Sequence, residues 1–331
     1  MMRAAVLEEI GSLRLKQVPV PEPGPGEVLV RIEANTICGT DLRIISGAKT
    51  AGVRPGVILG HEFAGRVAAV GRGVDGVPVG AQVTCSIVVS CQRCRACLSG
   101  REQLCENLVL FGYELDGGLA EYLLVPRIAM DHGNLVVLEK EIPATTLALA
   151  EPVSCCLNGA GQVAVAPGES VVVLGTGPIG LLHIALAKLA GATTILAAGR
   201  EGRLTAATDF GATCAVALTG EALTDEVRER TNGRGADVVI VAVGDLTLAN
   251  QALELAAIGG RVNYFAGFPK GKTASIDPNL IHYRELAVTG GSNARRADVR
   301  RAVELLSSGA LDVGRLVTHR FPLAELDAAV T

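Results

Sequence analysis

The sequence predicts an α/β protein that combines a β-rich domain with a doubly wound parallel sheet, and three observations support this prediction. Of the 331 residues, 49% are hydrophobic, which is enough for two domains with cores of their own. Beyond about residue 152, apolar runs alternate with helical patterns, which is typical of a parallel sheet covered on both faces. Glycine is frequent, at 40 residues, and tryptophan is absent, which favours tight turns over an aromatic-lined binding module.

The first 150 residues are predicted to be rich in β-strands. Val28, Val30 and Ile32 alternate with polar residues after a turn rich in proline and glycine, which is the pattern of a half-buried strand. Two more strands are expected, at 62–70 and 119–125.

From Pro152 onward the chain is predicted to form successive βαβ units, and this pattern stops near Thr289. The expected strands are 171–175, 194–198, 238–243 and 261–267. The expected helices are a run ending at Leu189, then 204–210, 247–257 and, after the last unit, 297–306.

Charge and hydropathy predict a soluble, cytoplasmic protein with a small-molecule ligand. The net charge of −4 is mixed in sign, which argues against a nucleic-acid partner. The most apolar stretch, 171–199, contains His183 and Lys188 and is interrupted by turn residues, so no membrane span is expected. A basic cluster, Arg295, Arg296, Arg300 and Arg301, is interpreted as the solvated face of one helix or as part of an oligomer contact.

A glycine-rich turn predicts a dinucleotide site. Residues 175–180 read GTGPIG between an apolar strand and a helical run, which is the context in which this pattern binds a pyrophosphate at a helix N-terminus. The candidate cofactor-binding residues are Gly175, Thr176, Gly177, Pro178, Ile179 and Gly180, together with Val243 and Gly267 at the ends of two later strands.

The end of the second strand of this region favours NADP over NAD. An NAD site usually places an acidic residue about 20 residues after the glycine turn, but the position nineteen after Gly180 is Gly199. Arg200 can pair with a 2′-phosphate and Arg203 can assist it. The alternative is that Arg200 is a solvated turn residue and that Glu201 binds the ribose.

Four cysteines within fifteen residues predict a closed metal site. Their spacing is C-x2-C-x2-C-x7-C, and four thiolates this close suit a tetrahedral structural zinc. An iron–sulfur cluster is the formal alternative, whereas core thiols do not suit so polar a loop. The nine cysteines are odd in number and clustered, which argues for reduced thiols rather than disulfides. The four residues are Cys91, Cys94, Cys97 and Cys105.

Three scattered motifs supply the ligand types of a catalytic zinc. They are CGTD at 38–41, GHE at 60–62 and AEP at 150–152. A catalytic zinc binds three protein groups drawn from cysteine, histidine and carboxylate, and keeps one position open. Taken singly, Cys38, His61 and Glu151 each have a structural explanation, so their combination carries the prediction.

The order of these motifs resembles the zinc-containing medium-chain alcohol and polyol dehydrogenases over nearly the whole chain. CGTD, GHE, the four-cysteine lobe, DGGLAEY at 116–122, AEP and GTGPIG follow one another as they do in that family. The polyol and threonine dehydrogenase branch looks most similar, because Glu151 stands where simple alcohol dehydrogenases have a cysteine.

The resemblance implies a GroES-like catalytic domain at 1–151, a Rossmann domain at 152–290 and a return to the catalytic domain at 291–331 that looks cut short. It implies a catalytic zinc on Cys38 and His61, completed by Glu62 or Glu151, and a substrate hydrogen bond from Thr40. It also implies a homodimer or homotetramer. One departure is Arg43, which stands where many relatives have a proton-relay histidine.

The expected activity is hydride transfer between NAD(P) and a secondary alcohol of a polyol, cyclitol or sugar alcohol. A threonine-type amino alcohol is the alternative substrate. Lys270 and Lys272 suggest a phosphorylated substrate, but a lysine pair beside glycine is more typical of a surface turn. A non-catalytic dinucleotide-binding protein is the alternative of another class, and the retained ligand residues argue against it.

Overall fold

The computed structural model describes residues 1–330, which divide into two units. The first unit comprises Met1–Ser154 together with the chain from Asn293 onward, and the second comprises Cys155–Ser292. The chain passes from one unit to the other within helix α5 (Ala150–Val163).

The second unit is built on a six-stranded parallel sheet of order β12-β11-β10-β13-β14-β15. Strand β10, which comes first along the chain, lies in the middle of the sheet. The strands that follow it in the sequence lie on either side. This is the doubly wound Rossmann order, in which ligands bind where the strand order reverses. The strands are β10 (Ser170–Leu174), β11 (Thr194–Ala198), β12 (Cys214–Val216), β13 (Ala236–Val241), β14 (Ala256–Tyr264) and β15 (Ala287–Gly290).

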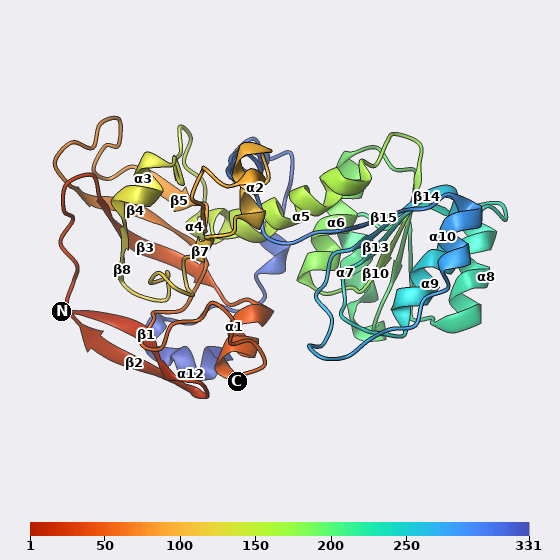
Figure 1. Cartoon of the computed structure of the whole chain (residues 1–331), viewed down its shortest axis with the longest axis horizontal. Helices are drawn as coiled ribbons and strands as arrows, with labels where there is room; N and C mark the ends of the chain where they lie inside the picture. The colour runs from red at the N-terminus through yellow and green to blue at the C-terminus, as the bar shows by residue number, and fades with distance from the viewer. Residues whose placement is uncertain (331) are drawn as a thin grey trace. The chain divides into compact units, whose positions relative to one another are not determined.

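Helices cover both faces of this sheet (Figure 1). Helices α8, α9 and α10 gather along one side of the strands in the view, while α6 and α7 lie on the other. The central strand β10 is buried along its whole length and β13 at every residue but Asp237, because both of their faces are covered. The helices are α6 (Pro178–Leu189), α7 (Leu204–Asp209), α8 (Gly220–Arg230), α9 (Leu248–Leu255) and α10 (Pro278–Arg284).

The first unit is dominated by a five-stranded antiparallel sheet of order β8-β3-β4-β5-β9. Two short antiparallel pairs, β1-β2 and β6-β7, accompany it. The strands are β1 (Met2–Glu9), β2 (Ser12–Val18), β3 (Val28–Thr36), β4 (Glu62–Val70), β5 (Gln82–Cys85), β6 (Val88–Val89), β7 (Val109–Leu110), β8 (Tyr122–Val125) and β9 (Leu135–Val137). The helices are α1 (Gly39–Ile45), α2 (Arg95–Leu98), α3 (Arg127–Asp131), α4 (Ala144–Leu147), α11 (Arg296–Ser307) and α12 (Leu326–Val330).

The predicted fold class is confirmed, and one strand is shorter than expected. Strand β8 begins at Tyr122 rather than at residue 119. The reason is that Leu119 and Ala120 pair with β1 instead: the N–H of Ala5 donates to the carbonyl oxygen of Leu119 at 2.8 Å. The long pair β1-β2 was not anticipated from the sequence.

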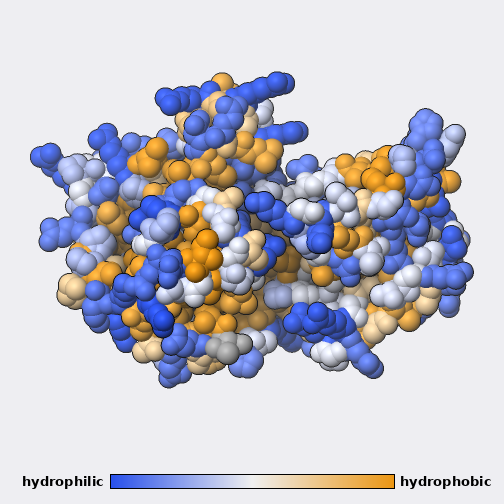
Figure 2. Space-filling view, turned by 60° about the horizontal axis from the view of Figure 1, so that its bottom comes forward, coloured by the Kyte–Doolittle hydropathy of each residue, from blue (hydrophilic) through white to orange (hydrophobic). Residues whose placement is uncertain are grey.

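The surface mixes polar and apolar residues. On the face drawn in Figure 2, hydrophobic patches are repeatedly interrupted by hydrophilic side chains. Among the helices of residues 1–330, none combines the length and apolar character needed to span a bilayer.

Candidate active site

Cys38 is fixed at the start of helix α1 by the aspartate three residues later. The N–H of Cys38 donates to Oδ2 of Asp41 at 2.9 Å, and the N–H of Asp41 donates to the carbonyl oxygen of Cys38 at 3.0 Å. Such a reciprocal pair sets the first turn of a helix. The backbone N–H of Thr40 also donates to the Cys38 thiol. Local sequence alone therefore fixes the position of this thiol.

His61 and Glu62 lie where strand β4 begins, and both are buried. Thr36 on β3 is the register partner of Glu62, and its hydroxyl contacts the Glu62 carboxylate. The pairing of β3 with β4 therefore brings the GHE motif next to the segment that leads into Cys38.

The DGGLAEY motif supports the segment that leads into His61. The N–H of Gly117 donates to the carbonyl oxygen of Ile58 at 2.8 Å, and the N–H of Gly118 donates to that of Gly60, also at 2.8 Å. The Asp116 carboxylate in turn accepts from the N–H of Ile58 at 3.1 Å. This motif therefore has a structural role beside the site.

Cys38, His61 and Glu62 form a group that suits a zinc ion. Their ligand atoms all lie within 4.8 Å of one another, and thiolate, imidazole and carboxylate are the donors of a catalytic zinc. Three donors leave a fourth position open. Glu151 does not belong to this group, although it is near enough for its charge to act on Glu62.

Burial and charge together set the protonation of the three ligands. Burial lowers the pKa of His61, but the charge and hydrogen bond of Asp41, together with a hydrogen bond to Cys38, outweigh burial and hold that pKa well above its usual value. Burial, with the charge of Glu151, raises the pKa of Glu62 to about 7. Burial also raises the pKa of Cys38, against the opposing effect of His61. A cation bound here would offset the repulsion between the acidic groups.

Two residues near this group were not assigned a role from the sequence. Oδ1 of the fully buried Asp41 lies 3.2 Å from Nδ1 of His61, so Asp41 orients the ring as a carboxylate behind a metal-bound histidine does. The spacing of Asp41 from Cys38 was the available signal. The ring of Tyr113 lies 5.5 Å from that of His61, centroid to centroid, and only the fold brings these two rings together.

The four cysteines of the lobe form a second group with metal-ligand geometry. Their sulfur atoms lie within 4.8 Å of one another, with Cys94 3.5 Å from Cys97 and 3.9 Å from Cys105. Backbone N–H groups of Arg93 and Cys94 lower the pKa of Cys91 to about 6, which favours a thiolate. All four donors come from the protein, so a tetrahedral ion here has no open position.

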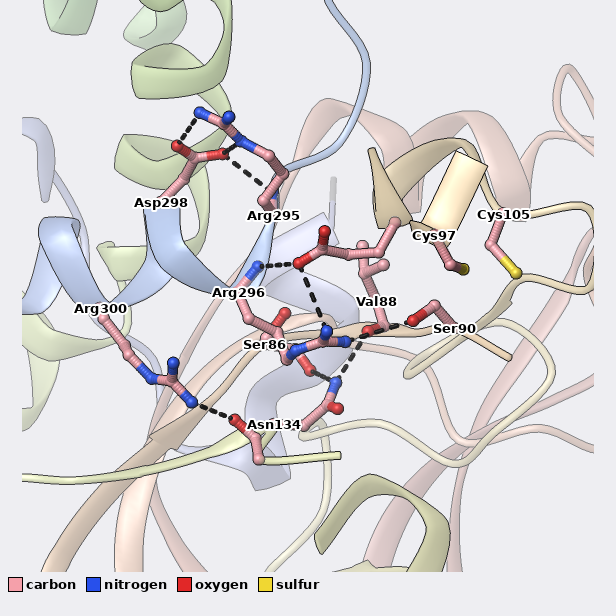
Figure 3. A network of polar contacts seen from close by, with 12 residues as sticks. Ser86, Val88, Ser90, Cys97, Cys105, Asn134, Arg295, Arg296, Asp298 and Arg300 are labelled. Carbon is pink, nitrogen blue, oxygen red and sulfur yellow. Dashed lines mark hydrogen bonds and ion pairs between the residues drawn. The ribbon is translucent and has the colours of Figure 1, made fainter. Parts of the chain in front are cut away.

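An arginine of helix α11 connects this lobe to the rest of the first unit (Figure 3). The N–H of Arg296 donates to Oε1 of Glu102 at 3.1 Å, the two side chains form an ion pair at 3.6 Å, and Nη1 of Arg296 donates to the Ser90 hydroxyl at 3.2 Å. The interpretation of the arginine cluster as a solvated face is therefore wrong for Arg296. Its side chain is 17% exposed, because Glu102 and Ser90 draw it inward.

The glycine turn of the second unit lies between β10 and α6. A Cβ at position 180 would overlap the carbonyl oxygen of Gly175, so only glycine allows this close approach of helix and strand. Thr176 is buried, and Gly177, Pro178 and Ile179 lead into the first turn of α6. Val243, which is 40% exposed, lies against Gly175, and the carbonyl oxygen of Gly267 approaches Gly244.

The end of strand β11 leaves no room for a carboxylate at position 199. A Cβ there would overlap the side chain of Thr176. Arg200 and Arg203 are exposed, and within residues 1–330 neither forms an ion pair. Nη1 of Arg203 would lie 3.6 Å from a Cβ placed on Gly177, so this guanidinium lies beside the glycine turn. Glu201 is also exposed.

Two family models match this chain. A model of the alcohol dehydrogenase GroES-like domain matches residues 24–132, and a model of zinc-binding dehydrogenases matches residues 178–308. The L-threonine 3-dehydrogenase of Pyrococcus furiosus is 37% identical over 313 residues, which cover 93% of this chain and 87% of the relative. The chain belongs to the zinc-containing medium-chain dehydrogenase family.

Two solved structures illustrate the range of this family. A zinc-binding dehydrogenase from Sinorhizobium meliloti, bound to NADP, is 36% identical, with a TM-score of 0.92 over 100% of this chain and 95% of that chain. The 2R,3R-butanediol dehydrogenase of Bacillus subtilis is 28% identical, with a TM-score of 0.85 over 96% of this chain and 91% of that chain. This dehydrogenase therefore acts on an alcohol with zinc and a nicotinamide dinucleotide.

Proposed function

We propose that this dehydrogenase oxidises the secondary alcohol of a small polar substrate at a zinc ion held by Cys38, His61 and Glu62. The observation that carries the proposal is the grouping of these three buried ligands, with Asp41 behind His61. When bound, zinc supplies Lewis acidity that lowers the pKa of the substrate hydroxyl. Glu151 is proposed to lie outside the first ligand shell and to act on Glu62 through its charge.

The chain's own residues prepare the substrate for hydride transfer. Asp41 holds the imidazole of His61 in one orientation, and Thr40 offers a hydroxyl that accepts a hydrogen bond from the substrate hydroxyl and relays its proton by donating its own to water. The exposed Arg43 stands where a relay histidine was expected, and an arginine does not exchange its proton near neutral pH. We therefore propose that the proton continues from Thr40 to solvent through water. A bound nicotinamide would supply the hydride acceptor for the substrate carbon.

NADP is proposed as the preferred cofactor. Gly199 excludes the carboxylate that would repel a 2′-phosphate, while Arg200 and Arg203 offer two guanidinium groups without ion-pair partners in the described chain. The NADP-bound relative from Sinorhizobium meliloti supports this preference.

A β-hydroxy amino acid of the threonine type is proposed as the first substrate class. Relatives of 35–37% identity that carry the name L-threonine 3-dehydrogenase support this choice over the polyol expected from the sequence. A vicinal diol is the second class, and the butanediol dehydrogenase relative supports it.

One experiment tests these proposals together. The zinc-loaded enzyme is assayed with L-threonine, 2,3-butanediol, sorbitol and myo-inositol, each with NAD and with NADP, by the absorbance of the reduced nicotinamide. We expect the largest kcat/KM with L-threonine and NADP. Arg200→Ala should lower the NADP-to-NAD ratio of kcat/KM about tenfold or more, and the exposed Arg228→Ala is the matched control. A wild-type preference for NAD would contradict the cofactor assignment.

A further inference from the structure

We propose that Lys49 selects substrates that carry an anionic group, a carboxylate or a phosphate, close to the carbinol carbon. The proposal rests on the proposed function, because it places the reacting alcohol beside His61. It adds a residue that lies outside all the motifs of the sequence analysis.

Lys49 contacts the ring of Tyr113, and that ring lies beside the proposed zinc ligand His61. Its Nζ atom is 4.7 Å from the centroid of the Tyr113 ring, and that ring is 5.5 Å from the ring of His61. These two distances together place the ammonium within about 10 Å of the His61 ring. The charge of Cys38 also acts on Lys49 directly.

The backbone holds Lys49 in this position. Its N–H donates to the carbonyl oxygen of Arg43 at 2.9 Å, and the N–H of Arg54 donates to the carbonyl oxygen of Tyr113 at 3.0 Å. Nε of Arg54 further donates to the carbonyl oxygen of Glu114 at 3.1 Å. The loop that carries Lys49 is therefore attached to the segment that carries Tyr113, rather than extending freely into solvent.

The ammonium of Lys49 has a cation–π partner but no ion-pair partner within residues 1–330. The carboxylate whose charge acts on Lys49, that of Glu114, already accepts a hydrogen bond at Oε2 from the N–H of Leu110 at 2.9 Å. Burial and then the charge of Arg43 lower the pKa of Lys49. A half-buried cation beside a second cation favours the arrival of an anion, which would relieve both effects.

The spacing limits where the anion lies on the substrate. An alcohol oxygen on zinc lies about 2 Å from the metal, and a carboxylate accepts a charge-assisted hydrogen bond at about 2.8 Å. The two ring distances set an upper limit of about 10 Å between the His61 ring and Nζ of Lys49, and an anionic group one or two carbons beyond the carbinol carbon falls within this limit. L-Threonine meets this condition and an uncharged polyol does not, which distinguishes the two substrate classes.

The test compares substrates that share a carbinol carbon and differ in charge. For the zinc-loaded full chain, kcat/KM is measured for 3-hydroxybutyrate against 1,3-butanediol, and for glycerol 3-phosphate against glycerol. We expect the ratio of the charged to the uncharged substrate to fall about 10- to 100-fold in Lys49→Met, the loss of one charge-assisted hydrogen bond, and to recover in part in Lys49→Arg. If the ratio falls for the 3-hydroxybutyrate pair, Lys49 binds a carboxylate. If it falls for the glycerol 3-phosphate pair, Lys49 binds a phosphate. Lys140→Met, at an exposed lysine of the same unit, should leave both ratios unchanged.

Ratios in Lys49→Met within twofold of the wild type for both pairs would overturn the inference, provided that circular dichroism shows a folded variant. If the wild type oxidises none of these alcohols, nor those in the earlier panel, the proposed function fails instead. Calorimetric binding of 3-hydroxybutyrate to the zinc-loaded protein then decides the inference by itself. Binding that is lost in Lys49→Met supports the anion subsite, and equal or absent binding in both proteins rejects it.

Discussion

The two metal-ligand groups of this dehydrogenase differ in how the chain builds them. The lobe takes Cys91, Cys94, Cys97 and Cys105 from one short stretch of chain, where backbone N–H groups lower the pKa of Cys91 and Cys94 and burial raises that of Cys105. The other group takes Cys38, His61 and Glu62 from a helix start and a strand start, and burial raises the pKa of two of its three ligands. One short stretch of chain thus supplies all four ligands of the closed group. The open group instead combines ligands from two elements that are distant in the sequence.

The largest expected difference between the groups is in turnover. Cys38→Ser should lower kcat by at least about 1,000-fold, because the metal's stabilisation of the alkoxide amounts to several kcal/mol. Cys94→Ser should instead lower the thermal midpoint, with a much smaller loss of turnover in the protein that remains folded. Steady-state assays, zinc content and thermal melts separate the two outcomes. Equal losses of turnover in both variants would remove the distinction between an open and a closed site.

Asp41→Asn tests whether the carboxylate that faces His61 strengthens zinc binding at the open site but not at the lobe. The substitution removes the charge that faces Nδ1 of His61 but keeps the size of the side chain. We expect zinc affinity at this site to fall about 10- to 100-fold, because a carboxylate behind a histidine ligand raises its basicity. Competition with a chromophoric chelator measures this in zinc-loaded protein, and zinc release from the four cysteines of the lobe, which the substitution does not touch, is the internal control. Unchanged release of both ions would argue against a role for Asp41.

Arg296→Met tests the attachment of the lobe to helix α11. The variant leaves the buried Glu102 without its ion pair, so we expect the free energy of unfolding to fall by about 2 kcal/mol. Arg301→Met is the matched control on the same helix, since its ion pair with Glu304 is exposed and should contribute less than about 1 kcal/mol. Urea unfolding monitored by zinc release measures both. A stability loss as small as that of the control would mean that Arg296 does not support the lobe.

His183 shows what burial does to a histidine that lacks an acidic neighbour. Its ring packs on Phe265, neither ring nitrogen has a hydrogen-bond partner within residues 1–330, and burial lowers its pKa from 6.5 to about 3. Below pH 6.5 the unfolded chain binds a proton at this residue and the native protein does not. Stability is therefore lost as the pH falls from 6.5 towards 3, by about 1.4 kcal/mol at pH 5.5.

His183→Leu should remove this loss, which denaturant unfolding at pH 7.5 and 5.5 measures. His319→Asn, at an exposed histidine, should leave the pH dependence as it is in the wild type. An unchanged pH dependence in His183→Leu would mean that the buried ring is protonated in the native state.

Much of the fold was predictable because its signals are local. The strands at 62–70 and 194–198 were expected with the bounds that the structure has, since apolar-rich segments closed by glycines specify them. Pairing between distant segments was not predictable: Leu119 and Ala120 join β1 rather than β8, although their own sequence continues the strand pattern.

The sequence by itself determined the family, the four-cysteine lobe and the glycine turn, because each depends on residue types at short fixed spacings. It also named Glu62 and Glu151 without choosing between them. Only the tertiary structure brought Glu62 into the group with Cys38 and His61, through the register of β3 against β4. The same holds for Lys49 and Tyr113, which are 64 positions apart and meet because hydrogen bonds join their two loops. Contacts of this kind join residues that are far apart in the sequence, so no local sequence pattern predicts them.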